Sequence, residues 1–444
     1  MKLLKVLSLI VIMTVFFNPT VSAKDTLYSL NKYPEEEFTY LKKSYNSNNQ
    51  IDGYVVAGTY LQENKKISNT SYIRDTEIIL RKYNLKGGVV WDYTYGNNYN
   101  DAIDYLSYTY NETNQIDGYL ISLMKPNEEK EAENPPKENL LIKIDLEGKE
   151  VLKKELNLEN YARINKIIKT NSNDNTKYLA LVELTTEDNK SVILGLDKNL
   201  NETFRKNAND SNNYIDIVEV KNNETFNYVV LSEQTLPDEK KISIQSIDIT
   251  GNAIREKIEL DQIETAALIN SKEGFILYGL TKEVKLKDGE LTYYLINYDS
   301  EYNELWETVG EEAVAEEPIK LLNSTQKEKN NYFLLSKNNT DKAIEVTKFD
   351  EEGLFIEKIK KLNNDYYTIN NFDYYKEVLY FVGNITCPED ETCDYKTNSL
   401  FLISNKDKVI EVKKDTSINI ILVLSVVIIL IVFFILLRKK RRAN

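Results

Sequence analysis

The stretch "KFDEEG", residues 348–353, has the form of a tight polar turn, and close variants of it occur elsewhere in the chain. Three of them are "KYNLKG" at 82–87, "KIDLEG" at 143–148 and "SIDITG" at 246–251. Each keeps Asp or Asn in the third position and Gly in the sixth. An Asp or Asn side chain accepts hydrogen bonds from the backbone of its own turn, and Gly readily takes the left-handed conformation. These stretches therefore predict one hairpin turn that is used repeatedly.

The spacing of the turns reveals a repeat. The residues that open the turns, the last of them in a weaker match, are Asn84, Asp145, Asp197, Asp248, Asp299, Asp350 and Asn405. Successive positions are 61, 52, 51, 51, 51 and 55 residues apart, a period typical of solenoids, propellers and other arrays. Two turns have Leu200 and Tyr302 in place of the glycine. We expect the asparagines that follow them, Asn201 and Asn303, to take the left-handed conformation there.

Every repeat contains the same order of short apolar runs. In the first repeat, "GYVVAG" (53–58) is followed by a polar loop and by "TEIILRKYN" (76–84), which ends in the turn. A third run, "VVWDYTY" (89–95), follows the turn, and a fourth, "AIDYLSYTYN" (102–111), leads into the next repeat. Such β-branched, aromatic and often alternating runs predict strands. Four antiparallel strands in about 50 residues are typical of one propeller blade.

The seven repeats predict an all-β fold, a seven-bladed β-propeller over residues 24–415 with the turn between the second and third strands of each blade. The seventh repeat lacks a fourth run. We expect "EFTYLKKSYN" (37–46) to complete that blade and close the ring, because closure removes free sheet edges. Six or eight blades, or two stacked β-sandwiches, remain as alternatives.

The N-terminal residues predict export. Residues 1–23 have Lys2 and Lys5 at their start, an apolar centre, and the small residues Val21-Ser22-Ala23 at their end. This order is typical of a secretory signal peptide. An uncleaved membrane anchor is the alternative, but the apolar centre is short for a membrane span.

The C-terminal residues predict a single membrane span. Residues 416–437 include twenty residues without a charge, 418–437, which as a helix would cross the ~30 Å hydrocarbon layer of a lipid bilayer. The basic tail, 438–444, is expected in the cytoplasm. Residues 24–415 would then form an extracytoplasmic domain at the cell surface, held at the cell membrane by one helix.

Composition excludes several classes of function. The chain contains no histidine, which rules out His-dependent nucleophilic catalysis and His-ligated zinc. Its formal net charge is −14, and the two terminal segments are basic, so residues 24–415 are more acidic still. Such a domain repels nucleic acid and anionic head groups and favours cations or basic partners.

The only two cysteines, Cys387 and Cys393, flank the acidic loop "CPEDETC". In an exported domain, two cysteines this close predict a disulfide that closes a small loop. A two-thiolate metal site is the alternative, and further Cys or His ligands for it are missing from the sequence.

Five variable loops are expected between the first and second strands. They span residues 61–75, 125–139, 234–241, 281–289 and 384–398. Their Pro, Glu and Lys content is typical of solvated insertions. The carboxylates of the last loop would suit a weak calcium site, since calcium takes oxygen ligands, although we assign no metal. These carboxylates are Glu389, Asp390, Glu391 and Asp394.

The seven turns, together with Trp91 and Trp306, resemble the repeats of secreted bacterial propellers of quinoprotein-like or lipoprotein type. Each tryptophan lies seven residues after the residue that opens its turn, on the strand that follows the turn. In the other repeats this strand carries residues such as Leu152 or Phe204. The resemblance implies the architecture and no bound cofactor. We interpret the two tryptophans as packing between blades.

These observations favour a binding or scaffold module over an enzyme. No nucleophile with a neighbouring base is apparent, and 70 acidic residues do not single out a catalytic pair, so we assign no catalytic residue. We expect the ligand to be an extracellular protein or glycan. The alternative is a propeller-fold glycoside hydrolase, which needs two carboxylates about 5–9 Å apart in a cleft. A Tyr-lined rim would favour recognition.

Overall fold

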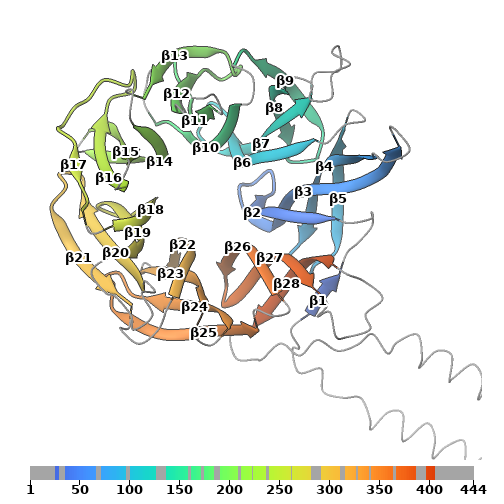
Figure 1. The fold of residues 1–444 in the computed structure, drawn as a ribbon. Coiled ribbons are helices and arrows are strands. Elements are labelled where there is room, and N and C mark those ends of the chain that lie inside the picture. The colour runs from blue at the N-terminus through green and yellow to red at the C-terminus, as the bar shows by residue number, and fades with distance from the viewer. Residues whose placement is uncertain are drawn as a thin grey trace, which may run out of the picture. The chain divides into compact units, whose positions relative to one another are not determined.

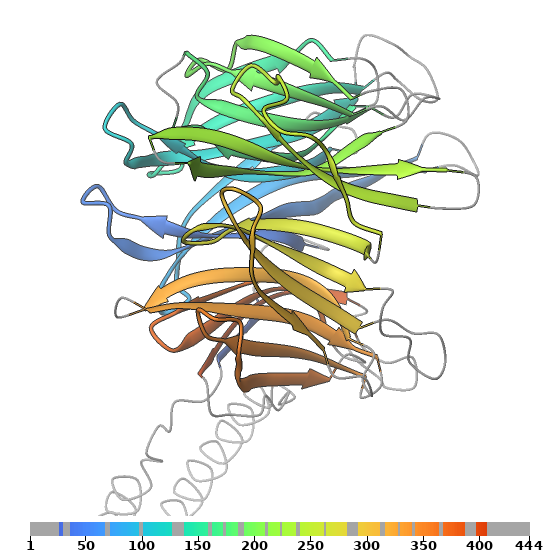
Figure 2. The same cartoon turned by 90° about the vertical axis from the view of Figure 1, so that its left-hand side faces the viewer.

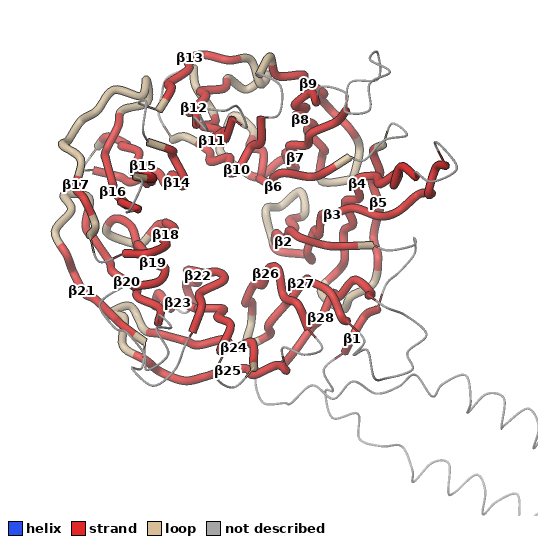
Figure 3. The backbone as a smooth tube through the Cα atoms, in the orientation of Figure 1, coloured by secondary structure: helices blue, strands red, loops and turns tan. Residues whose placement is uncertain are grey.

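The structure is a computed structural model that describes residues between 26 and 405. The described segments are 26–29, 36–66, 72–96, 101–126, 137–158, 162–171, 175–184, 191–208, 212–222, 224–236, 240–261, 263–281, 292–310, 316–326, 329–339, 342–363, 367–386 and 397–405. All of them belong to the larger of two compact units, Met1–Lys408. As Figure 3 shows, they are strands joined by turns and loops.

The described strands form seven four-stranded antiparallel sheets. The first three sheets comprise β2 (Glu37–Tyr45), β3 (Ile51–Lys66), β4 (Tyr72–Asn84) and β5 (Val89–Tyr95); β6 (Ala102–Tyr110), β7 (Ile116–Pro126), β8 (Lys137–Asp145) and β9 (Glu150–Leu156); and β10 (Ala162–Lys169), β11 (Tyr178–Leu184), β12 (Ser191–Leu196) and β13 (Glu202–Asn207). The next three comprise β14 (Asn213–Asn222), β15 (Thr225–Thr235), β16 (Lys240–Ile247) and β17 (Ile258–Glu259); β18 (Ile263–Asn270), β19 (Gly274–Thr281), β20 (Thr292–Asp299) and β21 (Glu304–Val309); and β22 (Glu316–Gln326), β23 (Lys329–Asn338), β24 (Ala343–Phe349) and β25 (Phe355–Asn363). The last sheet comprises β26 (Tyr367–Tyr375), β27 (Val378–Thr386), β28 (Thr397–Asn405) and β1 (Thr26–Ser29).

The sheets are arranged in chain order around a central opening (Figure 1). The first strand of each sheet is innermost, and β26 of the last sheet lies beside β2 of the first. The prediction of an all-β propeller is confirmed. Viewed from the side in Figure 2, the blue β2–β3 hairpin and the blue-green β6–β7 hairpin project on the same side of the ring.

The order of strands within a sheet differs from the sequence prediction by one strand. The run 102–111, expected to end the first blade, is instead the innermost strand β6 of the second sheet, where Leu106 pairs opposite Ile121. The recurring turn therefore joins the third and fourth strands, as between β4 and β5. Periodicity alone identifies strands but does not show to which sheet a strand at a boundary belongs.

The strand that completes the last sheet was also predicted wrongly. Residues 37–46 are not there, because β2 pairs with β3 and buries Phe38 and Leu41 in the first sheet. The fourth strand of the last sheet is β1, whose Thr26 pairs opposite Ile403 of β28. The four residues of β1 are too few to show a clear strand pattern, whereas the nine residues of β2 show one and were assigned to the last sheet instead. The N-terminal strand still ties the two ends of the ring together.

The core lies between neighbouring sheets. One cluster joins Val55 and Leu80 of the first sheet to Leu106 and Ile142 of the second, all of them fully buried. The middle strands are buried on both faces, and every residue of β12 is buried. Full burial of a large apolar side chain contributes about 1.5–3 kcal/mol, so the stack of sheets stabilises the ring.

Several predictions concern residues outside the described segments and stay predictions. They cover the signal peptide (1–23), the membrane span (416–437), the basic tail (438–444), the cysteine pair, and the carboxylates of loop 384–398. Within the described residues there is no helix long and apolar enough to cross a membrane. The variable loops lie between second and third strands. The first is shorter than expected, since β3 extends to Lys66 and β4 begins at Tyr72.

Candidate functional site: turns, tryptophans and the central channel

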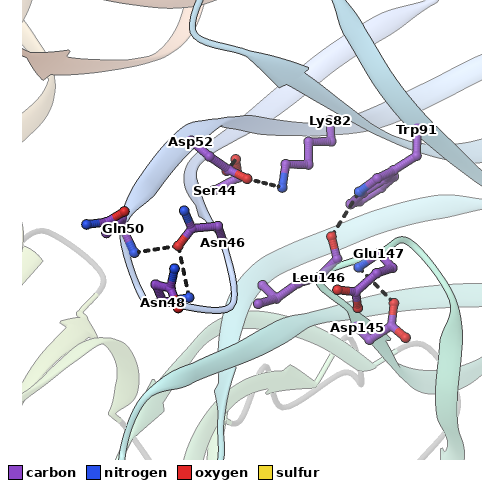
Figure 4. Close-up of polar contacts among 10 residues, drawn as sticks. All are labelled: Ser44, Asn46, Asn48, Gln50, Asp52, Lys82, Trp91, Asp145, Leu146 and Glu147. Carbon is purple, nitrogen blue, oxygen red and sulfur yellow. Dashed lines mark hydrogen bonds and ion pairs between the residues drawn. The ribbon is translucent and has the colours of Figure 1, made fainter.

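The six recurring turns whose side chains the structure describes share one hydrogen-bond pattern. In the second sheet, Asp145 Oδ1 accepts hydrogen bonds from the backbone N–H of Glu147 (3.0 Å) and Lys149 (2.8 Å), and Figure 4 shows the first. The same two contacts occur at Asn84, Asp197, Asp248, Asp299 and Asp350. Burial acts to raise the pKa of Asp197, but hydrogen bonds from Asn201 and the turn backbone outweigh it and hold the pKa below its usual range. The seventh position, Asn405, is the last residue of β28.

The left-handed residue of the two glycine-free turns is not the one predicted. Leu200 and Tyr302 themselves have positive φ, at 62° and 67°. The asparagines that follow instead donate from Nδ2 to the turn carboxylate, Asn201 to Asp197 at 3.0 Å and Asn303 to its equivalent at 2.8 Å. The turn fixes which position must be left-handed, and these hydrogen bonds help to offset the strain.

The same turn also occurs at two places that sequence reasoning missed. Asn46 Oδ1 accepts hydrogen bonds from the backbone N–H of Asn48 and Gln50 in the β2–β3 hairpin, both at 3.0 Å (Figure 4). Asn111 does the same in the β6–β7 hairpin. The signal was present, because "NQIDGY" follows closely after both asparagines.

Both tryptophans contact the turn of the next sheet. Trp91 Nε1 donates to the carbonyl oxygen of Leu146 at 3.0 Å, as drawn in Figure 4, and its ring lies against Gly148. Trp306 Nε1 donates to the carbonyl oxygen of Glu351, also at 3.0 Å, and its ring lies against Gly353. The indoles thus join neighbouring sheets through backbone contacts, as expected for packing between blades.

The innermost strands and Tyr278 of β19 line a cavity of about 650 Å³ in the central channel. Its lining is polar and aromatic as well as apolar. The titratable side chains in this lining are Lys42, Tyr105, Lys166, Asp216, Tyr278 and Lys320. They come from strands far apart in the sequence, and sequence reasoning did not single them out.

A bulge repeated in every innermost strand places many of these side chains. Each of these strands shifts register against its neighbour at the same place, and such bulges re-aim the side chains beside them. The residues that follow the shift are Tyr40, Tyr105, Lys166, Asp216, Thr265, Lys320 and Asn371. Neighbours in this ring contact each other: Lys166 Nζ lies 2.5 Å from Asp216 Oδ1, and Lys320 Nζ donates to Asn371 Oδ1.

Of the three lysines that line the cavity, Lys166 has a carboxylate partner, and Lys42 and Lys320 have neutral partners. Lys166 forms its ion pair with Asp216, which also accepts a hydrogen bond from the backbone of Leu268 at 2.7 Å. Lys320 contacts only neutral groups, the amide of Asn371 and a backbone carbonyl. Lys42 faces tyrosine rings, the nearer centroid being 5.5 Å from Nζ. Among the described carboxylates, none lies within ion-pair distance of Lys42 or Lys320.

Burial and like charge weaken protonation of these two lysines. Burial, together with the positive charges of Lys42 and Lys43, lowers the pKa of Lys320 to about 7, while Asp373 opposes the shift. Burial, with the charge of Lys166, lowers the pKa of Lys42 to about 8. Burial raises the pKa of Tyr105 and of Tyr278, so both hydroxyls stay protonated near neutral pH.

The described residues that line the cavity include no pair of carboxylates. Asp216 is the only carboxylate among the residues that line the described cavity, and it is paired with Lys166. The described residues also contain no group of three or more Cys, Asp or Glu that could hold a metal ion.

Comparisons with known proteins reach no further than the fold. No protein-family model matches the sequence, and no curated protein does. Among solved structures, the β-propeller domain of the Trilobed protease from Pyrococcus furiosus is similar at 14% identity and a TM-score of 0.43, over 86% of this chain and 100% of that one. The Nup133 β-propeller domain of Vanderwaltozyma polyspora matches at 10% and 0.38, over 86% and 100%. An apocarotenoid oxygenase of Synechocystis matches at 9% and 0.40, over 77% and 93%. These distant similarities assign no family, and the quinoprotein-like resemblance extends only to the propeller fold.

Proposed function

We propose that this chain is a membrane-anchored, seven-bladed surface propeller that acts as a non-enzymatic binding or scaffold module. Its ligand would be an extracellular protein or glycan, and the central channel would hold the bound group. The signal-peptide pattern of residues 1–23 and the apolar span 418–437 support placement at the cell membrane, with the C-terminus in the cytoplasm.

One observation carries the preference for binding over catalysis. The described lining of the cavity offers one carboxylate, Asp216, which is already paired with Lys166. The nearby Asp373 is paired with Lys43, whereas a glycoside hydrolase needs both an acid and a second carboxylate. The rest of the lining combines the faces and hydroxyls of Tyr105 and Tyr278 with amides such as Asn270. Aromatic faces pack against the apolar parts of a ligand, and Tyr hydroxyls form hydrogen bonds with its polar groups.

The experiment uses the full chain in nonionic detergent, since a membrane span is predicted. Binding to immobilised glycans and release of reducing sugars are measured on the same set of oligosaccharides. The proposal expects retention of at least one glycan, or of a surface protein, without release of sugar. Sugar release that disappears in Asp216→Asn would contradict it and support the hydrolase.

A further inference from the structure

We propose that the central channel binds a small anionic ligand, one that carries a phosphate, sulfate or carboxylate group, and that Lys42 and Lys320 are its anion-binding side chains. This inference rests on the proposed binding function and specifies the chemistry of the ligand. It also goes against the net charge of the chain, which by itself favours cations or basic partners.

The pairing of charges in the channel carries the argument. Lys166 is paired with Asp216 at 2.5 Å, and Lys43 with Asp373 at 3.0 Å. Among the described residues, these two pairs occupy the aspartates nearest to the cavity. Lys42 and Lys320 have only neutral partners. A half-buried ammonium group without an anion carries a desolvation cost that hydrogen bonds to neutral groups only partly offset.

An anion between Lys42 and Lys320 would remove this cost. Each lysine senses the charges of the surrounding ones, and the charge of Lys42 contributes to the lowered pKa of Lys320. Both lysines also line the same cavity, so one ligand there can contact both. Hydrogen bonds between ionised partners are about twice as strong as neutral ones, and low-dielectric walls strengthen them further. The acidic exterior does not neutralise this site, because solvent screens distant surface charges.

The remainder of the lining indicates a small polar ligand. A cavity of about 650 Å³ lies within the range of small-molecule sites. Tyr105 and Tyr278 provide aromatic faces, and Asn165, Asn270 and Asn323 provide amide donors and acceptors. An acidic sugar would use all three kinds of group, while a free oxyanion would use only the lysines.

Binding should weaken as pH rises. Only protonated lysine attracts an anion, and the lowered pKa values of Lys320 (about 7) and Lys42 (about 8) mean that both lose charge between pH 6.5 and 9. The charged and titratable groups that face these two lysines are Lys43, Lys166, Asp216, Asp373, Tyr105, Tyr108 and Tyr278. The tyrosines stay neutral throughout this range because burial raises their pKa.

The test is titration calorimetry of the full chain in nonionic detergent. The probes are inorganic phosphate, glucuronate and, as the neutral control, glucose, at pH 6.5 and pH 9 and constant ionic strength. We expect phosphate or glucuronate to bind at pH 6.5 and to bind more weakly at pH 9. Lys320→Met and Lys42→Met should each weaken binding about tenfold or more, since each removes a charge-assisted contact. Lys198→Met removes a lysine whose side chain is 68% exposed and should change nothing.

The outcomes separate the two proposals. Equal binding of phosphate and glucuronate supports a free oxyanion site, and tighter binding of glucuronate supports an acidic sugar. The inference is overturned if neither anion binds, or if Lys320→Met and Lys42→Met bind like the wild type while their melting temperatures are no lower than that of the wild type. Retention of neutral glycans alone would overturn the anion site and leave the binding function standing. Sugar release from glycans would overturn the binding function itself.

Discussion

The contact of Trp91 with the turn of the next sheet predicts a large effect of Gly148→Ala. Gly148 has a φ of +86°, and a Cβ at this position would lie 2.7 Å from Cδ2 of the indole. The left-handed conformation costs a non-glycine residue about 1–2 kcal/mol. Displacing the indole also breaks the Nε1 hydrogen bond to Leu146 at 3.0 Å, worth about 1 kcal/mol. We expect the substitution to lower the free energy of unfolding by about 2–4 kcal/mol.

Gly251→Ala is the matched control. Gly251 has a φ of +83°, and the atom nearest to its added Cβ would be Lys206 Cβ at 3.0 Å, a looser approach than the 2.7 Å to the indole at Gly148. This control should cost the backbone strain alone, about 1–2 kcal/mol. Urea unfolding of the full chain in nonionic detergent, followed by tryptophan fluorescence, measures both. In a Trp91→Ala background the cost of Gly148→Ala should fall to that of the control. If Gly148→Ala and Gly251→Ala lower the free energy of unfolding equally in the wild-type background, the contact between the indole and Gly148 would be refuted.

Three further predictions concern stability. Deleting β1 (Thr26–Ser29) removes the outer partner of β28 and should lower the free energy of unfolding by about 1–4 kcal/mol, since each cross-strand pair contributes roughly 0.2–1 kcal/mol. An unchanged melting midpoint would count against closure of the ring by this strand. Arg81→Met removes the guanidinium that contacts both oxygens of the buried Glu36 carboxylate at 3.0 Å, and should lower the free energy of unfolding by about 3–5 kcal/mol. Adding Glu36→Gln should restore part of this loss, and an equal loss in the double variant would contradict the prediction. Lys320→Met should raise the melting midpoint at pH 6 and raise it less at pH 9. The lowered pKa means that the charged form of Lys320 destabilises the folded state, and less of this form is present in the folded state at pH 9. An increase in melting midpoint that grows with pH would contradict this.

The architecture was predictable because local chemistry repeats. Asp145 and Gly148 specify a hairpin by themselves, and apolar runs such as 76–84 predict strands from their pattern. The assignment of strands to sheets was not predictable in the same way. Phe38 and Leu41 mark a buried strand in any sheet, and only pairing in three dimensions places them innermost in the first one.

The channel was missed because its residues are far apart in sequence and ordinary in type. Lys42 and Lys320 are two lysines in a chain rich in charge. A weak signal existed, since several inner-strand bulges leave two residues between successive apolar ones, as between the buried Ile164 and Ile167 or between Ile369 and Phe372. This breaks the alternation expected for a strand, but the closeness of Lys320 to Lys42 depends on closure of the ring.

The most direct test of the account is the position of a bound oxyanion in crystals of the full chain grown at pH 6.5 with selenate, located by anomalous scattering. We expect a selenium peak inside the channel, within ion-pair distance of the Nζ atoms of Lys42 and Lys320, and its loss in Lys320→Met. Selenate found only on exposed lysines, with none in the channel, would contradict it.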